Sequence, residues 1–321
     1  MKKSHFIYIC LVLLVLIGAL FVFARRSQET KTTQTSTASS HFTSKTITHD
    51  FGTTKLDKEP KKIVILNNLY GEILLPLGIT PVGATTAQVG SQEFSTLFKK
   101  TFKKAEVVSV GWQKTPDLEK IAELEPDVIL MTVHQQDLYD KLNQIAPTIG
   151  YQINTESNWD FRDTALKVAD IFDKKDQMQK AIDELDQKQA KFAQKVKATY
   201  GNQRLMYVRV TEKDIRYYGY GRFGFLYETY GFNRAESFNP SDMYQLIDSE
   251  KLLQLNPDLL IVQADSEDLL KTKLKESSVW GQLKAVQNKK VIYADYSTYM
   301  LGFGLMSQDA IMSQIEKEWL D

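Results

Sequence analysis

The sequence has a single cysteine, Cys10, and it lies inside an apolar run near the N-terminus. The rest of the chain therefore cannot form a disulfide, bind a metal through thiolates or use a cysteine nucleophile. Cys10 is also inside the apolar run instead of just after it, so it cannot be the lipid-carrying cysteine of a lipoprotein signal. These absences are compatible with an exported domain that contains no thiol.

Histidine is scarce as well, and three of the four histidines, His5, His41 and His49, fall in or near the N-terminal segment. Direct capture of zinc or manganese needs several converging ligands, so His134 alone argues against it. The sequence also lacks a Gly-x-Ser-x-Gly motif and a phosphate-binding glycine loop, which argues against an enzyme. The 40 lysines and arginines are balanced by 40 aspartates and glutamates, so the net charge is zero. A nucleic-acid partner is therefore not expected.

Long hydrophobic runs are confined to one place, from Phe6 to Ala24, between Lys2-Lys3 and Arg25-Arg26. Such a run approaches the roughly 20 residues that span a bilayer as a helix. Residues 1–26 are predicted to be a membrane segment, with an uncleaved signal-anchor favoured over a cleaved signal peptide. Residues 27–49 are rich in Ser, Thr, Gln and Lys, and are predicted to be a disordered tether.

Apolar strand-like segments then alternate with helical ones. Buried-strand patterns at residues 63–66, 128–131, 205–210 and 259–262 are separated by helical segments, several of them ending at Gly or Pro-Asp. This alternation predicts an α/β fold with mostly parallel sheets.

The middle of the chain differs, because residues 161–200 contain no proline or glycine and are apolar at helical spacing. We predict an N-terminal α/β lobe at 50–157, a connecting helix at 158–202 and a C-terminal α/β lobe at 203–321. A helical connection predicts only a small closure of the lobes on ligand binding.

An internal repeat supports two similar lobes. The segment from Asp117 to Met131 aligns without gaps to the segment from Asp248 to Val262. A duplicated lobe on each side of a helical spacer is the simplest explanation. Two lobes create a cleft, and a cleft between lobes is the expected ligand site.

The blocks TPDLEKIAELEPDVIL and DSEKLLQLNPDLLIV, with VWGQLKAVQNKKVIYAD near the end, resemble the helical-backbone class of substrate-binding proteins. These proteins serve ABC importers of ferric siderophores, haem and cobalamin. The resemblance runs from about Thr48 to the C-terminus. Within the class the chain is most similar to Gram-positive ferric-hydroxamate binders, through Tyr207-Val208-Arg209-Val210, Tyr218-Gly219-Tyr220-Gly221-Arg222 and Asp295–Tyr299. It departs from them in lacking the lipoprotein cysteine.

The resemblance implies a monomeric substrate-binding protein on the outer face of the cytoplasmic membrane, either anchored or secreted. It would capture a ferric siderophore, of hydroxamate type, and deliver it to an ABC permease. Iron would be bound only as the chelate, with no resident cofactor. Haem or cobalamin is the alternative cargo, since Tyr299, Tyr220, Met300 or His134 could supply an axial ligand to haem. An exported adhesion or scaffold protein is a different class, which a two-lobed duplication does not favour.

The predicted ligand-binding residues share aromatic or guanidinium side chains and positions near predicted strand ends. A planar guanidinium can donate to two oxygens of a chelate, and aromatic walls can cover its apolar parts. We expect Arg222 to be the donor and Tyr220 and Tyr299 to be walls, although Arg222 could instead be a surface arginine. The full predicted set is Tyr70, Trp112, Arg209, Tyr220, Arg222, Tyr296 and Tyr299.

Two glutamates occupy matching places in the repeat, Glu119 and Glu250, each near the start of a predicted helix. In the family that the chain resembles, glutamates at these positions dock onto arginines of the permease. Two carboxylates held apart by a rigid body would provide orientation as well as attraction. The alternative is that both are ordinary helix-start acids favoured by the helix dipole.

Overall fold

The computed structural model describes residues 42–152, 160–236 and 242–320 of the chain. Residues 43–321 form one compact unit. Within the described ranges, no helix combines the length and the apolar composition that a bilayer span requires. The membrane segment predicted for residues 1–26 lies outside these ranges, as does most of the predicted tether.

The N-terminal lobe is built on a six-stranded sheet of order β6-β5-β4-β3-β7-β8, in which all neighbours are parallel except β5 and β6. An antiparallel pair, β1 and β2, precedes this sheet. Strands β3 and β7 are apolar throughout, as expected for parallel strands covered on both faces. The strands are β1 (Lys45–His49), β2 (Gly52–Leu56), β3 (Ile63–Ile65), β4 (Gly83–Thr86), β5 (Val108–Trp112), β6 (Thr115–Pro116), β7 (Val128–Met131) and β8 (Thr148–Gly150).

The C-terminal lobe has a second sheet, of order β12-β10-β9-β13-β14, with β11 also paired to β9. Strands β9, β13 and β14 run parallel, but β10 is antiparallel to both β9 and β12. The expectation of a mostly parallel sheet is therefore corrected to a mixed sheet here. The reason is the tight turn at Thr211–Asp214, which joins β9 and β10 as a hairpin. The strands are β9 (Arg204–Val210), β10 (Ile215–Tyr218), β11 (Asn233–Arg234), β12 (Tyr244–Ile247), β13 (Leu259–Ala264) and β14 (Val291–Tyr293).

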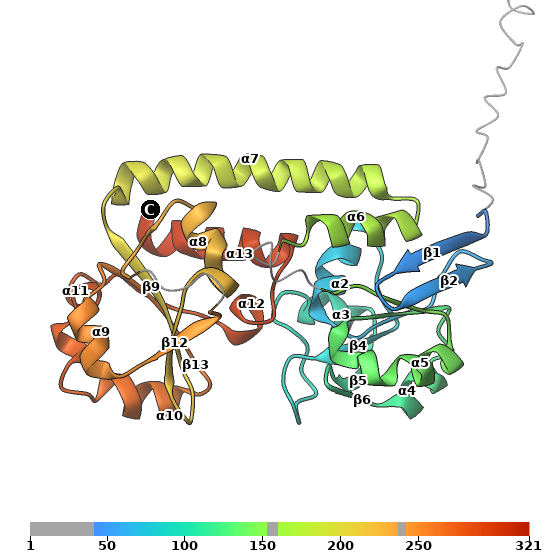
Figure 1. Cartoon of the computed structure of the whole chain (residues 1–321), viewed down its shortest axis with the longest axis horizontal. Helices are drawn as coiled ribbons and strands as arrows, with labels where there is room; N and C mark the ends of the chain where they lie inside the picture. Colours follow the sequence, from blue (N-terminus) through green and yellow to red (C-terminus); the bar gives the residue numbers. More distant parts are fainter. Residues whose placement is uncertain (1–41, 153–159, 237–241, 321) are drawn as a thin grey trace, which may run out of the picture. The chain divides into compact units, whose positions relative to one another are not determined.

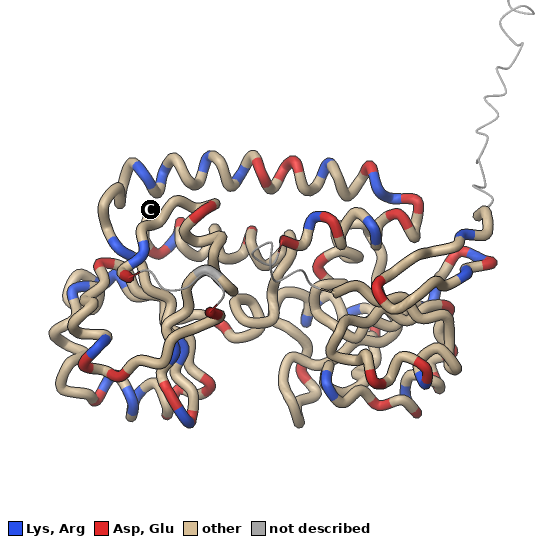
Figure 2. The backbone as a smooth tube through the Cα atoms, in the orientation of Figure 1, with Lys and Arg blue, Asp and Glu red and all other residues tan. Residues whose placement is uncertain are grey.

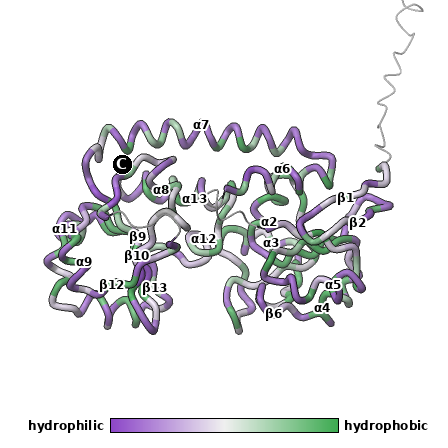
Figure 3. The backbone as a smooth tube through the Cα atoms, in the orientation of Figure 1, coloured by the Kyte–Doolittle hydropathy of each residue, from purple (hydrophilic) through white to green (hydrophobic). Residues whose placement is uncertain are grey.

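Helices flank both sheets (Figure 1). In the N-terminal lobe they are α2 (Asn68–Leu74), η1 (Leu75–Leu77), α3 (Lys99–Lys104), α4 (Leu118–Glu123), η2 (Val133–Leu138) and α5 (Tyr139–Ile145). Those that follow are α6 (Arg162–Ile171), α7 (Lys175–Tyr200), α8 (Tyr220–Glu228), α9 (Ser249–Leu255), α10 (Glu267–Leu270), η3 (Lys271–Lys275), η4 (Trp280–Gln282), α11 (Lys284–Gln287), α12 (Tyr296–Tyr299), α13 (Leu305–Ile315) and η5 (Glu316–Leu320). Each lobe buries its own hydrophobic cluster, and hydrophilic and hydrophobic residues alternate along α7 in Figure 3.

Helix α7 connects the lobes as one continuous helix of 26 residues, about 39 Å long at the usual rise per residue. Near its start, Gln177 donates to the carbonyl of Pro76, and further along Lys188 and Lys195 pair with α13 and η5. Residues of both charge signs occur along this helix (Figure 2). Its buried residues recur every three or four positions: Met178, Ile182, Leu185, Gln189, Phe192, Val196 and Tyr200.

The repeated segments fold into matching units with the same hydrogen bonds. Asp117 caps α4 by accepting the N–H of Lys120, and Asp248 caps α9 by accepting that of Lys251. After each helix, the aspartate of the Pro-Asp pair fastens the start of a parallel strand. Asp127 accepts the N–H groups of Lys61 and Lys62 before β3, and Asp258 accepts that of Arg204 at the start of β9.

The predicted tether ends too late in the sequence. Lys45–His49 already forms β1, because the alternating pattern around β-branched Ile47 suits a strand. His49 contacts Thr54 of β2 through Nε2, 3.0 Å from Oγ1, and Thr54 donates to the carbonyl of Thr148 at 2.7 Å. The β1–β2 pair is thus attached to β8 of the first sheet.

Glu125 and Asn256 occupy equivalent positions after the repeated helices, and both have a left-handed backbone, with φ of 46° and 42°. Asparagine tolerates this conformation better than glutamate. We expect Glu125→Asn to raise the free energy of unfolding by about 0.5–1 kcal/mol, measured by denaturant titration. Glu123→Asn, an exposed change in the helix that precedes Glu125, should not raise the free energy of unfolding. A lower stability for Glu125→Asn would contradict the argument.

Candidate functional site

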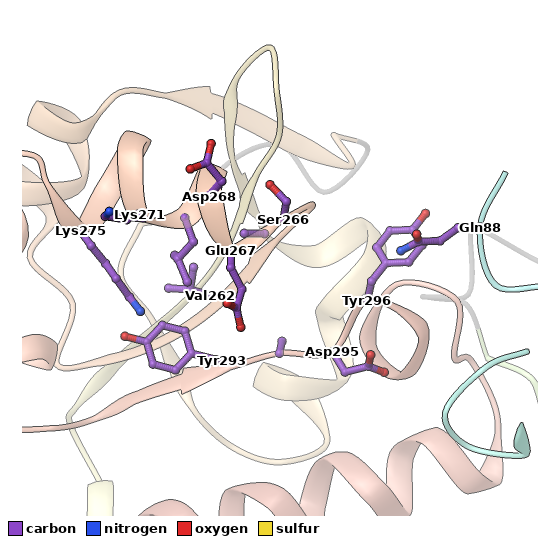
Figure 4. Close-up of a pocket in the computed structure, with 13 residues that line it drawn as sticks. Gln88, Val262, Ser266, Glu267, Asp268, Lys271, Lys275, Tyr293, Asp295 and Tyr296 are labelled. Carbon is purple, nitrogen blue, oxygen red and sulfur yellow. The ribbon is translucent and has the colours of Figure 1, made fainter. Parts of the chain in front are cut away.

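A cavity of about 900 Å³ opens at the carboxyl end of the parallel strands of the C-terminal lobe (Figure 4). In open α/β sheets this edge is where ligands bind. Its floor includes Val262 and Ala264 of β13, and α10 and the residues after β14 form its walls. Gln88, which follows β4, is a lining residue from the N-terminal lobe. The cavity therefore receives side chains from both lobes.

Arg209 and Tyr296 meet beside this cavity. Tyr296 lines it, and the guanidinium carbon of Arg209 lies 5.0 Å from the centre of the Tyr296 ring. Asp265 accepts the Nε and Nη2 hydrogens of Arg209 at 2.9 and 2.8 Å. Desolvation opposes the charge of Arg209, but the bonds to Asp265 outweigh it and raise the pKa. A guanidinium has five N–H groups, so a fixed and partly neutralised donor remains available for a ligand oxygen.

An aromatic cluster lies behind Arg209 on the same face of the sheet. The Tyr207 ring stacks on Phe223 with centroids 3.8 Å apart, and on Tyr299 at 5.9 Å. Within the part of the chain that the structure describes, the buried oxygens Tyr207 Oη and Gln263 Oε1 have no hydrogen-bond partner. Each buried polar group without a partner lowers the stability of the fold by about 1–3 kcal/mol. Two such groups on one face of the sheet indicate that this face serves a purpose other than stability.

Arg222 is buried, with 5% of its surface exposed, and lies in the first turn of α8 and not in the predicted turn. Gly219 is the N-cap of this helix, which kinks at Phe223. The guanidinium donates to the carbonyl of Met300, and its carbon lies 3.5 Å from the centre of the Phe303 ring. Desolvation lowers the pKa of Arg222 to about 9, so it is still charged at neutral pH.

Two aromatic residues of the predicted ligand-binding set lie in the interior. Tyr70 has 0% exposure, and its hydroxyl donates to the carbonyl of Met131. Tyr299 has 1% exposure and its hydroxyl lies 3.1 Å from Gln314 Oε1. Neither ring forms an open wall in this structure, because each packs with its hydroxyl already paired. Tyr220 is the first residue of α8, and its side chain lies outside the part of the molecule that the structure describes.

The N-terminal lobe presents polar groups at the matching edge of its own sheet. Trp112 is the last residue of β5, not part of a loop, and the Lys114 ammonium lies 5.8 Å from its ring centre. Desolvation, and secondarily the charge of Lys114, lower the pKa of His134, whose surface is exposed. Asn67 donates to Gln113 at 2.9 Å. Trp112, Lys114 and His134 thus each keep some surface that a ligand could contact.

Several candidate contact residues were missed in the sequence. Val89, Val133 and Met243 are exposed by 70%, 40% and 43%. The two valines follow β4 and β7, so they lie at the carboxyl ends of parallel strands, and Met243 lies against Gly221 of α8. Only the position of the two valines just after strands could have indicated them, whereas Met243 lies just before β12. Exposed apolar side chains at these edges suit an apolar ligand.

The two glutamates of the repeat, Glu119 and Glu250, are both exposed in the first turns of α4 and α9. The capped helix starts on which they lie match one another. The arrangement leaves both carboxylates open to a partner in solution or on a membrane protein.

A second set of contacts crosses between the lobes beside the cavity. Thr96, from the loop that carries Gln88, donates to Asp295 Oδ2 at 2.8 Å and its N–H donates to Ser297 at 3.1 Å. Asp295 also caps α12 by accepting the N–H of Thr298. Desolvation opposes ionisation of Asp295, but hydrogen bonds from these hydroxyls lower its pKa.

Comparison with known proteins shows the same fold and similar sequences. The model of the periplasmic binding protein family matches residues 63–298. The petrobactin-binding protein YclQ of Bacillus subtilis is 28% identical, over 98% of both chains. Its crystal structure gives a TM-score of 0.73 at 26% identity, covering 86% of this chain and 98% of that one. The iron(3+)-hydroxamate-binding protein FhuD of Bacillus subtilis is 26% identical, over 94% of this chain and 93% of its own. Staphylococcus aureus SirA complexed with staphyloferrin B gives a TM-score of 0.70 at 27% identity, covering 85% and 98%.

Asp295→Ala should remove both a helix cap and the bond to the other lobe, whereas Asp248→Ala removes only a cap. A cap alone is worth about 1 kcal/mol, and a hydrogen bond to a charged group about 1.5–3 kcal/mol. We expect Asp295→Ala to lower the free energy of unfolding by more than Asp248→Ala does, in parallel urea titrations. Equal losses would mean that the contact with Thr96 contributes nothing to stability.

Proposed function

We propose that this chain, which belongs to the periplasmic binding protein family, captures a ferric siderophore and delivers it to an ABC importer. The observation that carries the proposal is the Arg209 guanidinium, held by Asp265 against Tyr296 at a cavity of about 900 Å³. A volume of this size lies within the range of about 300–1,000 Å³ typical of small-molecule sites. We accordingly propose a binding role for the chain.

A ferric chelate brings its own six oxygen ligands, so the protein does not need to coordinate the iron. The protein must instead cover the apolar arms and donate hydrogen bonds to the iron-bound oxygens. Tyr296 can cover one face of the chelate, and Arg209 can donate to its oxygens. Trp112 and the exposed valines of the N-terminal lobe can cover the other face.

The charges of the site support a hydroxamate over a catecholate. Arg209 is offset by Asp265, and the side chains that line the cavity include three acids and two lysines. Those acids are Glu267, Asp268 and Asp295, and the lysines are Lys271 and Lys275. A triply negative catecholate complex would meet net repulsion here, whereas a neutral or cationic trihydroxamate would not.

Haem is the alternative that the sequence raised. It needs an axial ligand that is free to reach iron. Tyr299 is buried with its hydroxyl at Gln314, and His134 lies in the other lobe, beside Lys114. These positions favour a chelate that carries all its own ligands.

We further propose that the N-terminal segment, residues 1–26, holds the protein at the outer face of the cytoplasmic membrane. Its apolar run is long enough to anchor, and a tethered receptor stays close to its permease. Glu119 and Glu250 are the proposed permease contacts, since exposed acids on matching helices of the two lobes can pair with two separate basic sites.

Replacing Arg209 should test the proposed ligand site directly. We expect wild-type protein to show tryptophan quenching on addition of a ferric trihydroxamate, and Arg209→Ala to weaken binding by about 1–3 kcal/mol through loss of a charge-assisted hydrogen bond. Arg204→Ala is the matched control. Arg204 is the first residue of β9, at the opposite end of the strand from Arg209, and it forms an ion pair with Asp258. Equal affinities for all three proteins would remove Arg209 from the site, and no binding of any ferric chelate would refute the function.

Charge reversal at the docking acids should separate transport from binding. We expect Glu119→Lys and Glu250→Lys each to reduce iron uptake in cells strongly, because like charges would face the permease, while leaving the chelate affinity within about twofold. Glu123→Lys, exposed on the same helix as Glu119, is the control and should transport normally. Uptake that is unaffected in both docking variants would show that the acids serve only their helices.

A further inference from the structure

A buried carboxylate joins the two lobes. Glu72 lies on α2 in the N-terminal lobe and has 0% exposure. Its Oε1 accepts the N–H of Phe303 at 2.9 Å, and its Oε2 accepts those of Gly304 at 3.1 Å and Ser307 at 2.7 Å. All three donors belong to the C-terminal lobe, at the start of α13.

Helix α13 has no N-cap side chain of its own. Its N-cap is Gly304, and Glu72 accepts the orphan N–H groups that a capping residue would normally satisfy. A Cβ on Gly304 would lie 3.0 Å from Glu72 Cβ and 3.2 Å from its Oε2. The glycine therefore makes room for a cap that comes from the other lobe, where a negative charge also suits the helix dipole.

The segment held by Glu72 leads directly to the ligand site. Residues 300–304 connect α13 to α12, and α12 begins with Tyr296, which lines the cavity beside Arg209. On the other side of the segment, the Arg222 guanidinium lies over Phe303 and donates to Met300. The segment is thus clamped between a carboxylate of one lobe and a guanidinium of the other.

We infer that Glu72 is a positioning residue for the chelate, which sets the spacing of the lobes and the placement of α12 by capping α13 across the lobe interface. This inference rests on the proposed function of the cavity and adds a residue that does not touch the ligand. A carboxylate is needed, because its two oxygens serve three N–H donors. An amide in its place would turn an N–H group towards one of them.

The test separates a lobe-positioning role from simple helix capping. The full chain carrying Cys10→Ser, in detergent, would be compared with added Glu72→Gln, Glu72→Ala and Glu72→Ala/Gly304→Ser changes. The Gly304→Ser change supplies a capping side chain from within the C-terminal lobe. The Glu72→Ala change removes two of the three atoms that lie nearest to a side chain at position 304. Spin labels on cysteines introduced at Glu119 and Glu250, one in each lobe, report the lobe spacing.

We expect Glu72→Ala to lose stability, broaden the distance distribution between labels and weaken ferric trihydroxamate binding about tenfold or more, with Glu72→Gln intermediate. The double variant should recover thermal stability, because α13 is capped again. It should not recover the narrow distance distribution or the affinity, because the lobes are no longer tied. Glu72→Gln, isosteric with the wild type, keeps the test valid if the alanine variant folds poorly.

Recovery of both affinity and spacing in the double variant would show that Glu72 is only a helix cap, and would overturn the inference. Unchanged spacing and affinity in Glu72→Ala and Glu72→Gln would do the same. If wild-type protein binds no ferric chelate but the label distances still broaden in Glu72→Ala, the proposed ligand is wrong and the lobe-positioning role stands.

Discussion

The contact on which the lobe interface and the ligand site depend is that between the Glu72 carboxylate and the backbone N–H groups at the start of α13. An ionised carboxylate in a protein interior is costly unless its oxygens are fully hydrogen-bonded. Desolvation raises the pKa of Glu72, and the three N–H groups act against that rise. Glu72, whose carboxylate is costly to bury, holds α2, α13 and residues 300–304 in one arrangement. The cavity with Arg209 and Tyr296 inherits its geometry from that arrangement.

Most local elements could be predicted from the sequence, because their signals are local. Asp117 and Asp248 are strong N-caps, the Pro-Asp pairs end their helices, and the apolar runs gave β7, β9 and β13 to within two residues. Pairing between distant strands carries no such signal. The antiparallel pairing of β12 with β10 and the β1–β2 pair were therefore missed.

The site was predictable only in part, because residue type does not tell which face of a strand is covered. Arg209 and Tyr296 were both in the predicted set, and the structure brings them together. Tyr70 and Tyr299 had the same chemical justification but pack in the interior. Glu72 looked like an ordinary helix residue in the sequence. Its role depends on a glycine more than 200 residues later, at Gly304, and a single sequence does not reveal such a pair.

Each repeated unit makes its hydrogen bonds within its own lobe, and this affects how the chain folds. Asp127 and Asp258 each accept hydrogen bonds from the start of a central strand of their own lobe, and each lobe has a separate hydrophobic cluster. Each half can thus gain most of its native contacts without the other, as an independent foldon. The bonds made by Glu72 and Thr96 form only when the halves dock. We therefore expect the ligand cavity to assemble in the last step of folding and to be lost in the first step of unfolding.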